Sequence, residues 1–281
     1  MTRSRVLWAL GLVLGTIFTG LGIQAFYLEP SSLVTRRITL QIPGWPQDQR
    51  GLKIALLSDL HVGSPYCGLD KLDLVVARTN AERPDLVVLL GDYVIQGVLG
   101  GKFVAPEPIA EKLKELRAPL GVVAVLGNHD WWFDGPRVTS AFQQAGMVVL
   151  ENQARRISNN RNAFWIAGIA DKMTRLPKIP ETLQQVRDAS PVILIAHNPD
   201  IFPEVPARVN LTIAGHTHGG QVDLPLVGRL IVPSHYGQRF AYGQIIEGER
   251  HLFVTSGIGT SIIPVRFRVP PEIVVLTLDP Q

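Results

Sequence analysis

Five short apolar runs, each followed by residue types that bind divalent metals, constrain the fold of this chain most strongly. Such runs, rich in Val, Ile and Leu, are typical of strands that are buried on both faces. The runs and the polar residues after them are Ile54–Leu57 before Asp59 and His61, Leu86–Leu90 before Asp92, Val122–Leu126 before Asn128 and His129, Val192–Ala196 before His197, and Leu211–Ala214 before His216 and His218. Ligands of open parallel sheets bind beyond the carboxyl ends of the strands. The sequence therefore predicts one polar site at this edge.

The distribution of histidines supports the same site. The chain has seven histidines, and only His235 and His251 lie away from the ends of these runs. A single histidine after a strand is more often a hydrogen-bonded core or surface residue than a ligand. Five at the same structural position, together with two Asp and one Asn, favour metal binding.

Composition sets the size and class of the protein. A chain of 281 residues with 46% hydrophobic content can bury the core of one domain and still carry a separate terminal segment. The net charge is +3 and no Lys/Arg-rich block occurs, so we expect no nucleic-acid partner. Cys67 is the only cysteine, which excludes an internal disulfide and a cysteine-based zinc cluster.

The amino-terminal segment is predicted to cross a membrane once. The stretch Val6–Phe26 carries no charge and is 21 residues long, enough to span ~30 Å of hydrocarbon as a helix. A cleaved signal peptide is the alternative, but its apolar region would be unusually long, and Ile23-Gln24-Ala25 is a poor cleavage site. We therefore expect a single-pass anchor in the cell membrane.

The charges that flank this segment bear on its orientation. Arg3 and Arg5 lie next to its amino-terminal end, whereas Arg36 and Arg37 lie further from the other end. Because positive residues near a span favour the cytoplasm, the pattern slightly favours a position of the remaining domain on the outer face.

Beyond a short linker at Glu29–Ser32, the chain alternates between strand and helix patterns and later becomes richer in strand. Besides the five runs, the predicted strands are Thr35–Ile42, Met147–Leu150, Phe164–Ala167, Leu252–Thr255 and Ile273–Leu278, and the predicted helices are Leu69–Glu82, Ile109–Leu116 and Val138–Ala145. This order predicts an α/β fold in which two mixed sheets pack together with helices outside them.

The candidate ligands suit two ions. Carboxylate, amide and imidazole groups bind Mn, Fe, Zn or Mg, and no thiolate is available to impose a preference for zinc. Asp59 and His61 alternate in an extended segment, so both can hold one ion, and His216 and His218 do the same. Asp92 can bridge two ions at the separation of ~3.5–4 Å usual in hydrolytic centres.

The motifs Asp-x-His, Gly-Asp, Gly-Asn-His-Asp, Ala-His and Gly-His-Thr-His, in this order, resemble those of the calcineurin-like metallophosphoesterase superfamily over about residues 52–278. The stretch from Gly257 through Arg266 to Ile273 resembles a membrane-associated bacterial subgroup. That subgroup is linked to hydrolysis of UDP-2,3-diacylglucosamine in lipid A synthesis. Together with the apolar amino-terminal stretch, the resemblance divides the chain into an anchor at residues 1–28, a linker and first strand at 29–50, and a metallophosphoesterase domain at 51–281.

The resemblance also implies a role for each motif residue. The first ion would be held by Asp59, His61, Asp92 and His218, and the second by Asp92, Asn128, His197 and His216. Mn is the favoured metal, and His129 would be the general acid rather than a ligand. The superfamily often has a second Asp, in Gly-Asp-x-x-Asp, that orients this histidine. Ile95 takes its place here, which leaves Asp130 as a candidate.

Four further residues are candidate substrate contacts. Arg266 and Arg268 alternate, so they are predicted to face one side and either clamp a phosphate or form a solvated pair. Trp131, in the run Trp131–Phe133, is either a core residue or part of an apolar wall beside the site, and Tyr236 is a candidate for the substrate rim.

Together these features predict a membrane-anchored, dinuclear phosphoesterase that acts on a phosphodiester or pyrophosphate bond of a small-molecule or lipid-linked substrate. The alternatives are a phosphomonoesterase or phosphoprotein phosphatase, and a membrane-tethered binding module without activity. A binding module would be expected to lack some ligands, and every ligand position is filled.

Overall fold

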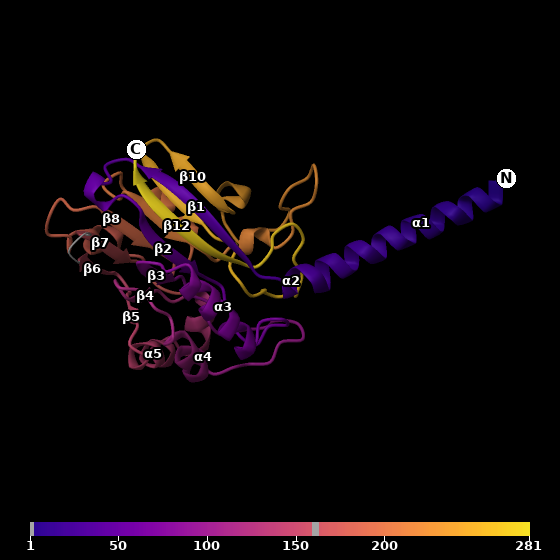
Figure 1. The fold of residues 1–281 in the computed structure, drawn as a ribbon, viewed down its shortest axis with the longest axis horizontal. Helices are drawn as coiled ribbons and strands as arrows, with labels where there is room; N and C mark the ends of the chain where they lie inside the picture. Colours follow the sequence, from indigo (N-terminus) through magenta and orange to yellow (C-terminus); the bar gives the residue numbers. More distant parts are fainter. Residues whose placement is uncertain (1–2, 159–162) are drawn as a thin grey trace.

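The computed structural model describes residues 3–158 and 163–281, which form a layered domain with one helix projecting from it (Figure 1). The first sheet has the strand order β1-β12-β2-β3-β4-β5. The bounds of these strands are β1 Val34–Ile42, β12 Glu272–Pro280, β2 Leu52–Leu57, β3 Leu86–Leu89, β4 Val122–Ala124 and β5 Val148–Val149. Only the pair β12 and β2 is antiparallel.

The second sheet has the strand order β10-β11-β9-β8-β7-β6 and is also mixed. Its strands are β10 Gly243–Glu247, β11 Arg250–Val254, β9 Leu211–Ala214, β8 Val192–Ile195, β7 Ala163–Gly168 and β6 Gln153–Ser158. The three central pairings are parallel and the two outer ones antiparallel. The two predicted mixed sheets are therefore confirmed.

Apolar side chains from alternate strand positions build three core layers. Between the sheets, Ile54 and Val88 of the first sheet pack with Ile193 and Ile213 of the second. The outer face of the first sheet is covered by helices α3 (Leu69–Ala81), α4 (Pro106–Leu113) and α5 (Asn128–Gln144). The outer face of the second sheet is covered by α6 (Ile179–Leu183) and by the 3-10 turns η3 (Pro199–Glu204) and η5 (Gly237–Phe240). The order of layers is helix, sheet, sheet, helix, as predicted.

Two helices begin earlier than predicted. Helix α4 begins at Pro106 because proline, which lacks a backbone N–H, fits the first turn of a helix. Helix α5 begins at Asn128 because the Asp130 carboxylate caps its first turn at Gly127, and it kinks at Asp134 before Pro136. Strands β6 and β10 were not predicted.

The amino-terminal helix α1 (Arg3–Ile23) continues through a π-helical turn, η1 (Gln24–Leu28), into α2 (Glu29–Ser31). The stretch Leu7–Ser31 has a mean hydropathy of 1.7 in its most apolar window, and none of that window is buried. By length and composition it is the one helix in the described residues that can cross a membrane.

The predicted linker at Glu29–Ser32 is instead folded against the domain. The Glu29 Oε1 atom accepts a hydrogen bond from the backbone N–H of Val269 at 2.5 Å, and Lys71 Nζ donates to the carbonyls of Ser31 and Ser32 at 2.7 and 2.8 Å. Glu29 and Pro30 are buried. These contacts fix the base of the projecting helix to the domain.

Candidate metal centre

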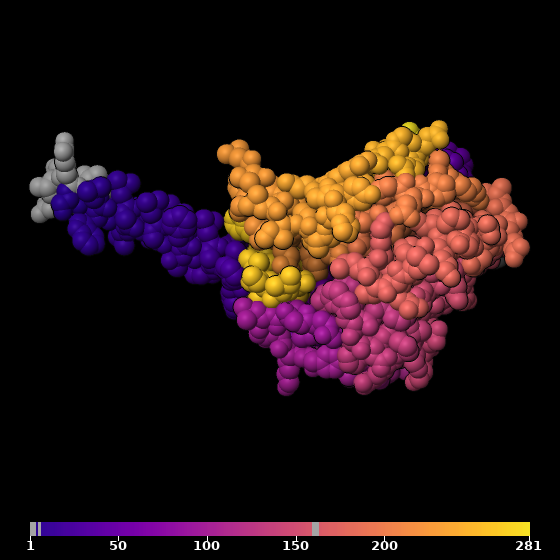
Figure 2. All heavy atoms as spheres, turned by 180° about the vertical axis from the view of Figure 1, so that it is seen from behind, coloured from indigo at the N-terminus to yellow at the C-terminus, as the bar shows by residue number. Residues whose placement is uncertain are grey.

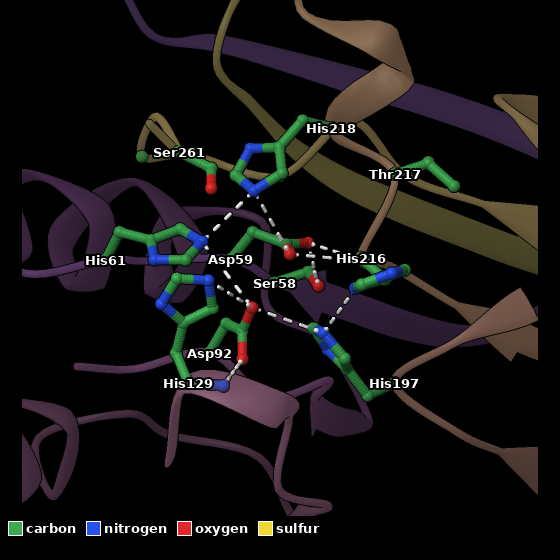
Figure 3. Close-up of polar contacts among 12 residues, drawn as sticks. Ser58, Asp59, His61, Asp92, His129, His197, His216, Thr217, His218 and Ser261 are labelled. Atoms are coloured by element: carbon green, nitrogen blue, oxygen red, sulfur yellow. Dashed lines mark hydrogen bonds and ion pairs between the residues drawn. The ribbon is translucent and has the colours of Figure 1, made fainter. Parts of the chain in front are cut away.

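The five predicted strand ends converge at one place, where the two sheets meet (Figure 3). Strands β2, β3 and β4 of the first sheet and β8 and β9 of the second supply the side chains. The eight predicted residues that come together there are Asp59, His61, Asp92, Asn128, His129, His197, His216 and His218, all of them buried.

The first group consists of Asp59, His61 and His218, whose ligand atoms all lie within 4.8 Å of one another. The Nε2 atoms of His61 and His218 are 3.0 Å apart, and His218 Nε2 is 3.5 Å from Asp59 Oδ1. Carboxylate and imidazole atoms that face one another at such distances, away from water, form a ligand set for a cation.

The second group consists of Asp92, His197 and His216, again with ligand atoms within 4.8 Å. His197 Nε2 lies 3.0 Å from His216 Nδ1 and 3.2 Å from Asn128 Oδ1. The amide oxygen of Asn128 therefore joins this group, as the sequence motif implies.

Asp92 lies between the two groups. Its Oδ2 atom is 3.6 Å from His61 Nε2 in the first group and 3.2 Å from His197 Nε2 in the second. Its Oδ1 atom accepts a hydrogen bond of 2.8 Å from the backbone N–H of His129. A carboxylate that faces both sets suits a dinuclear site.

Hydrogen bonds behind the ligands orient them. His197 Nδ1 is 2.7 Å from the carbonyl oxygen of Leu90, to which it donates, so Nε2 faces the second group. The Asp59 carboxylate accepts from Ser58 Oγ at 2.5 Å and from the backbone N–H of His216 at 3.0 Å.

The charge states of the histidines also suit metal binding. Burial lowers the pKa of His61 to about 3 and that of His216 to about 3, so both are neutral at pH 7, the form that binds metals. Burial would also lower the pKa of His197, but the negative charges of Asp92 and Asp59 outweigh it and raise that pKa to about 10. A proton on His197 thus compensates Asp92, and a bound cation would displace that proton.

Five candidate ligands have a left-handed backbone conformation, which costs L-residues roughly 1–2 kcal/mol each and is least unfavourable for Asn, Asp and His. Their φ angles are 50° at Asp59, 39° at His61, 54° at Asp92, 69° at His216 and 51° at His218. Strain of this kind is concentrated at functional sites.

Two glycines allow the strand ends to approach closely. A Cβ atom added at Gly127 would lie 2.2 Å from Asp92 Oδ1, and one added at Gly215 would lie 1.9 Å from Ser58 Oγ. Any side chain at either position would push the candidate ligands apart.

Asp130 does not orient His129. Its carboxylate accepts backbone N–H groups of Asp92, Tyr93 and Gly127 at 2.8, 2.8 and 2.9 Å, so it joins the β3 loop to the start of α5. Among the described residues, His129 Nδ1 has no hydrogen-bond partner. Its Nε2 lies 4.0 Å from Asp92 Oδ2, further than the imidazole nitrogens of His61 and His197. With His61 and Asp92 it also forms a third set of ligand atoms within 4.8 Å of one another.

The predicted pairing of Arg266 with Arg268 is wrong. Arg266 is fully buried and donates to four backbone carbonyls, those of Ser256, Gly257, Gly259 and Val269. Arg268 is exposed and has a φ of 60°, which breaks the alternation of an extended segment. Arg266 therefore fixes the loop after β11 and does not face substrate.

A pocket of about 390 Å³ opens beside the two groups of candidate ligands. Trp132, and not the predicted Trp131, forms its aromatic wall. The ring of Trp132 lies 5.0 Å from that of His129, whereas Trp131 packs on the core beneath Arg175, whose guanidinium is 4.4 Å from its ring. Tyr236 packs on Phe240 and does not line the pocket. Met173, Ile231 and Ile262 complete its apolar side.

One buried polar residue near the site, Asp171, was not among the residues predicted from the sequence. Asp171 follows β7 and is buried; its Oδ2 atom accepts from the N–H and Oγ1 of Thr174, while its Oδ1 atom has no partner among the residues described. Burial lowers the pKa of His129, and the negative charge of Asp171 acts against that lowering; the same charge adds to the effect of Asp92 and Asp59 in raising the pKa of His197. The signal was present, because Asp171 also follows an apolar strand, but it belongs to none of the motifs.

Comparison with known proteins gives a consistent picture. The family model described as calcineurin-like phosphoesterase matches residues 52–220. An uncharacterized metallophosphoesterase of Bacillus subtilis, YkuE, is 34% identical, with 95% of this chain and 93% of that protein covered. The phosphodiesterase YaeI of Escherichia coli is 31% identical over 99% of both chains. A zebrafish protein named transmembrane protein with metallophosphoesterase domain is 28% identical, covering 95% of this chain and 62% of its own.

If Asp92 serves both groups, its loss should empty both. We expect elemental analysis after Mn loading to find close to two ions per chain in the natural protein and close to none in Asp92→Ala. His235→Ala, which removes an exposed histidine outside the groups, should retain two. Retention of one ion by a folded Asp92→Ala protein would show that the carboxylate does not bridge.

Proposed function

We propose that this chain, which belongs to the calcineurin-like phosphoesterase family, hydrolyses a phosphodiester or pyrophosphate bond of a lipid-linked substrate at a membrane surface. The observation that carries the proposal is the position of the two ligand groups, both of which Asp92 faces, at the base of a pocket whose other side is apolar. Such a pocket accommodates a phosphate next to an acyl or other apolar group.

The donor set fits two divalent ions. The imidazole nitrogens of His61 and His218 are only 3.0 Å apart, as are those of His197 and His216. The carboxylates of Asp59 and Asp92 are buried beside them, and the proton on His197 balances only part of their negative charge. Bound cations would balance the rest. Asp59, His61, Asp92 and His218 would hold one ion, and Asp92, Asn128, His197 and His216 the other, with Mn favoured. Bound ions of this kind lower the pKa of water to give a nucleophile and neutralise phosphate oxygens.

His129 is assigned as the general acid. Its side chain lines the pocket together with Asp92 and Asn128, and it packs edge-on against His61 and beside Trp132. A proton donor in this position reaches the oxygen that leaves phosphorus, while Trp132 limits the access of water.

Asp171 is assigned as the positioning residue for His129. Asp130 is fully engaged by backbone N–H groups, and Ile95 cannot accept a hydrogen bond. Asp171 remains as a buried carboxylate with one oxygen that has no hydrogen-bond partner among the described residues. Burial lowers the pKa of His129, and the negative charges of Asp92 and Asp171 act against this lowering. Its position after β7 would compensate for the missing acidic residue at position 95.

A turnover screen tests the proposed substrate class. Purified full-length protein loaded with Mn would be offered a nitrophenyl phosphate monoester, a bis-nitrophenyl phosphodiester and UDP-2,3-diacylglucosamine in mixed micelles. We expect the highest kcat/KM on the lipid-linked pyrophosphate and measurable turnover of the diester, as the name of the Escherichia coli relative suggests. Preference for the monoester would favour a phosphomonoesterase instead.

The membrane attachment is proposed from the exposed apolar helix α1 and from the zebrafish relative that is named a transmembrane protein. An anchor fixed to the domain by Glu29 and Lys71 would keep the pocket near the lipid headgroups. There a diacylated substrate presents its phosphate.

Replacement of His129 tests its role. We expect His129→Ala to keep both ions and to lower kcat ~10²–10⁴-fold on alkyl phosphodiesters, the usual range for a lost general acid. The loss should be much smaller on nitrophenyl esters, whose leaving group needs no proton. If the variant instead lost an ion by elemental analysis, His129 would be a ligand.

Asp171→Asn tests the positioning role. We expect a ~10–100-fold loss of kcat on alkyl esters, with little loss on nitrophenyl esters, because the variant acts through His129. The double variant His129→Ala/Asp171→Asn should be no slower than His129→Ala alone. Asp73→Asn, at an exposed Asp on α3, is the matched control. Additive losses in the double variant would mean that Asp171 acts independently.

Protease accessibility of an epitope at Gln281 tests anchoring and orientation. We expect the full-length chain to stay in the membrane fraction. The charges of Arg3 and Arg5 favour an epitope on the outer face, whereas hydrolysis of UDP-linked lipids requires a cytoplasmic one, so the position of the epitope decides between the two. A soluble mature protein that begins near Phe26 would contradict the anchor. A cytoplasmic epitope would reverse the orientation and give the active site access to cytoplasmic UDP-linked lipids, which an outer-face domain would not meet.

A further inference from the structure

Two loops next to the base of α1 expose large apolar side chains to solvent. They are Leu226, Val227, Leu230, Ile231, Ile262 and Ile263, here called the apolar rim. Leu226 is fully exposed, and Ile231 and Ile262 are 81% and 70% exposed. Figures 1 and 2 place both loops, orange and yellow, on the side of the domain from which α1 projects. Scattered apolar residues are normal on a surface, but a concentration of this size marks an interaction site.

The rim is connected directly to the base of the anchor. The backbone N–H of Arg266 donates to the carbonyl of Ala25 in the π-helical turn at 2.9 Å, and that of Val269 donates to Glu29 Oε1. Tyr27 packs edge-on against Tyr66 of the domain, with ring centroids 5.8 Å apart. The position of the rim relative to the apolar helix is therefore set by the fold.

Internal hydrogen bonds hold the rim loops in shape. Gln221 accepts from the N–H of Ser261 at 2.8 Å and donates to its carbonyl at 3.2 Å, which joins the two loops. The N–H of Leu224 and that of Gly228 each bond to the other's carbonyl, at 3.0 and 2.8 Å, so Leu226 is held at the tip of a tight turn. The apolar side chains are thus presented to solvent by an ordered backbone.

We propose that the apolar rim inserts into the interfacial region of the lipid bilayer beside α1. The inference rests on the membrane attachment that is part of the proposed function. Ile231 and Ile262 belong both to the rim and to the wall of the pocket, so insertion turns the mouth of the pocket towards the headgroups. A lipid-borne phosphate reaches the ligand groups by this route without leaving the bilayer surface.

Two observations favour a bilayer as the occupant. The rim lies next to the apolar segment Leu7–Ser31, which is 25 residues long and has no buried residue in its most apolar window. The segment and the rim lie on the same side of the domain (Figure 2). Exposed Lys102 and Arg268 lie in the loops that border the rim, where they meet anionic headgroups. Apolar side chains bordered by basic ones are typical of interfacial insertion.

A polarity-sensitive fluorophore on a single introduced cysteine tests the insertion. Cys67 is buried and its thiol donates to the carbonyl of Leu60, so the label goes to the new site. Full-length Leu226→Cys is labelled and reconstituted in phosphatidylcholine–phosphatidylglycerol vesicles. The emission of the fluorophore should shift to the blue, and a nitroxide-labelled phosphatidylcholine in the vesicles should quench most of its intensity. Ile246→Cys is the matched control, an exposed isoleucine on β10, which lies away from α1 (Figure 1).

The outcomes separate this proposal from the proposed function. Flotation with the vesicles and turnover of bis-nitrophenyl phosphate are measured on the same samples. If the protein floats and hydrolyses the diester but position 226 is no more quenched than 246, the rim proposal fails while the proposed function stands. Blue-shifted emission without lipid quenching would mean contact with another protein copy, and would also overturn it. Protein that does not float would refute both the anchor and the rim.

A charge variant gives a second measurement. Leu226→Asp/Val227→Asp changes rim residues that do not line the pocket, so hydrolysis of the soluble diester should be unchanged. For the quenching measurement the fluorophore is placed on Leu230→Cys, with and without the two Asp substitutions. The charged variant should lose most of the quenching by the nitroxide lipid, because charged side chains resist insertion. Unchanged quenching in the charged variant would contradict insertion of the turn.

Discussion

The buried carboxylate of Asp92 is the interaction on which the site depends. Burial opposes its ionisation, yet the imidazoles of His197, His129 and His61 hold its pKa well below the usual range, so it stays charged. An ionised group without water must be compensated on every side. Histidines from three other strand ends, His61, His129 and His197, face it; the proton on His197 provides the compensating charge, and the backbone N–H of His129 donates to it from α5. The junction of the two sheets is organised around one negative charge.

Two residues that are not themselves candidate ligands, Asp130 and Arg266, hold the loops around Asp92 in place. Asp130 bonds the loop of Asp92 to the start of α5, so strand β3 and the helix cannot move independently. Arg266 fixes the loop after β11, whose Gly259 N–H donates to the carbonyl of Asp59 at 2.7 Å. The first and last parts of the domain thus meet at the ligands, although β2 and β11 lie in different sheets.

Much of the fold and most of the site could be predicted from the sequence, because apolar runs and the residues after them depend on local pattern. A buried strand can be predicted from its own apolar run, without knowledge of the strands that pair with it. The polar residues after each run then give the ligand positions. The start of α5 could not be predicted in this way, since it depends on a cap at Gly127 that joins β3. The pairing of Arg266 with Arg268 assumed an extended segment, whereas the left-handed turn at Arg268 is set by tertiary contacts. Asp171 was missed because its charge acts on His129 and His197 only through the pairing of β7 with β8, which no local sequence pattern shows.

The left-handed backbone at five candidate ligands bears on how the protein can change over time. Summed at roughly 1–2 kcal/mol each, this strain is comparable with the whole net stability of a typical domain, about 5–15 kcal/mol, although Asp and His bear it more easily than other residues. Glycine at any of these positions would relieve it and remove a ligand in the same step. Without bound ions, replacement of one of these residues by glycine would therefore be expected to raise stability while it removes a candidate ligand.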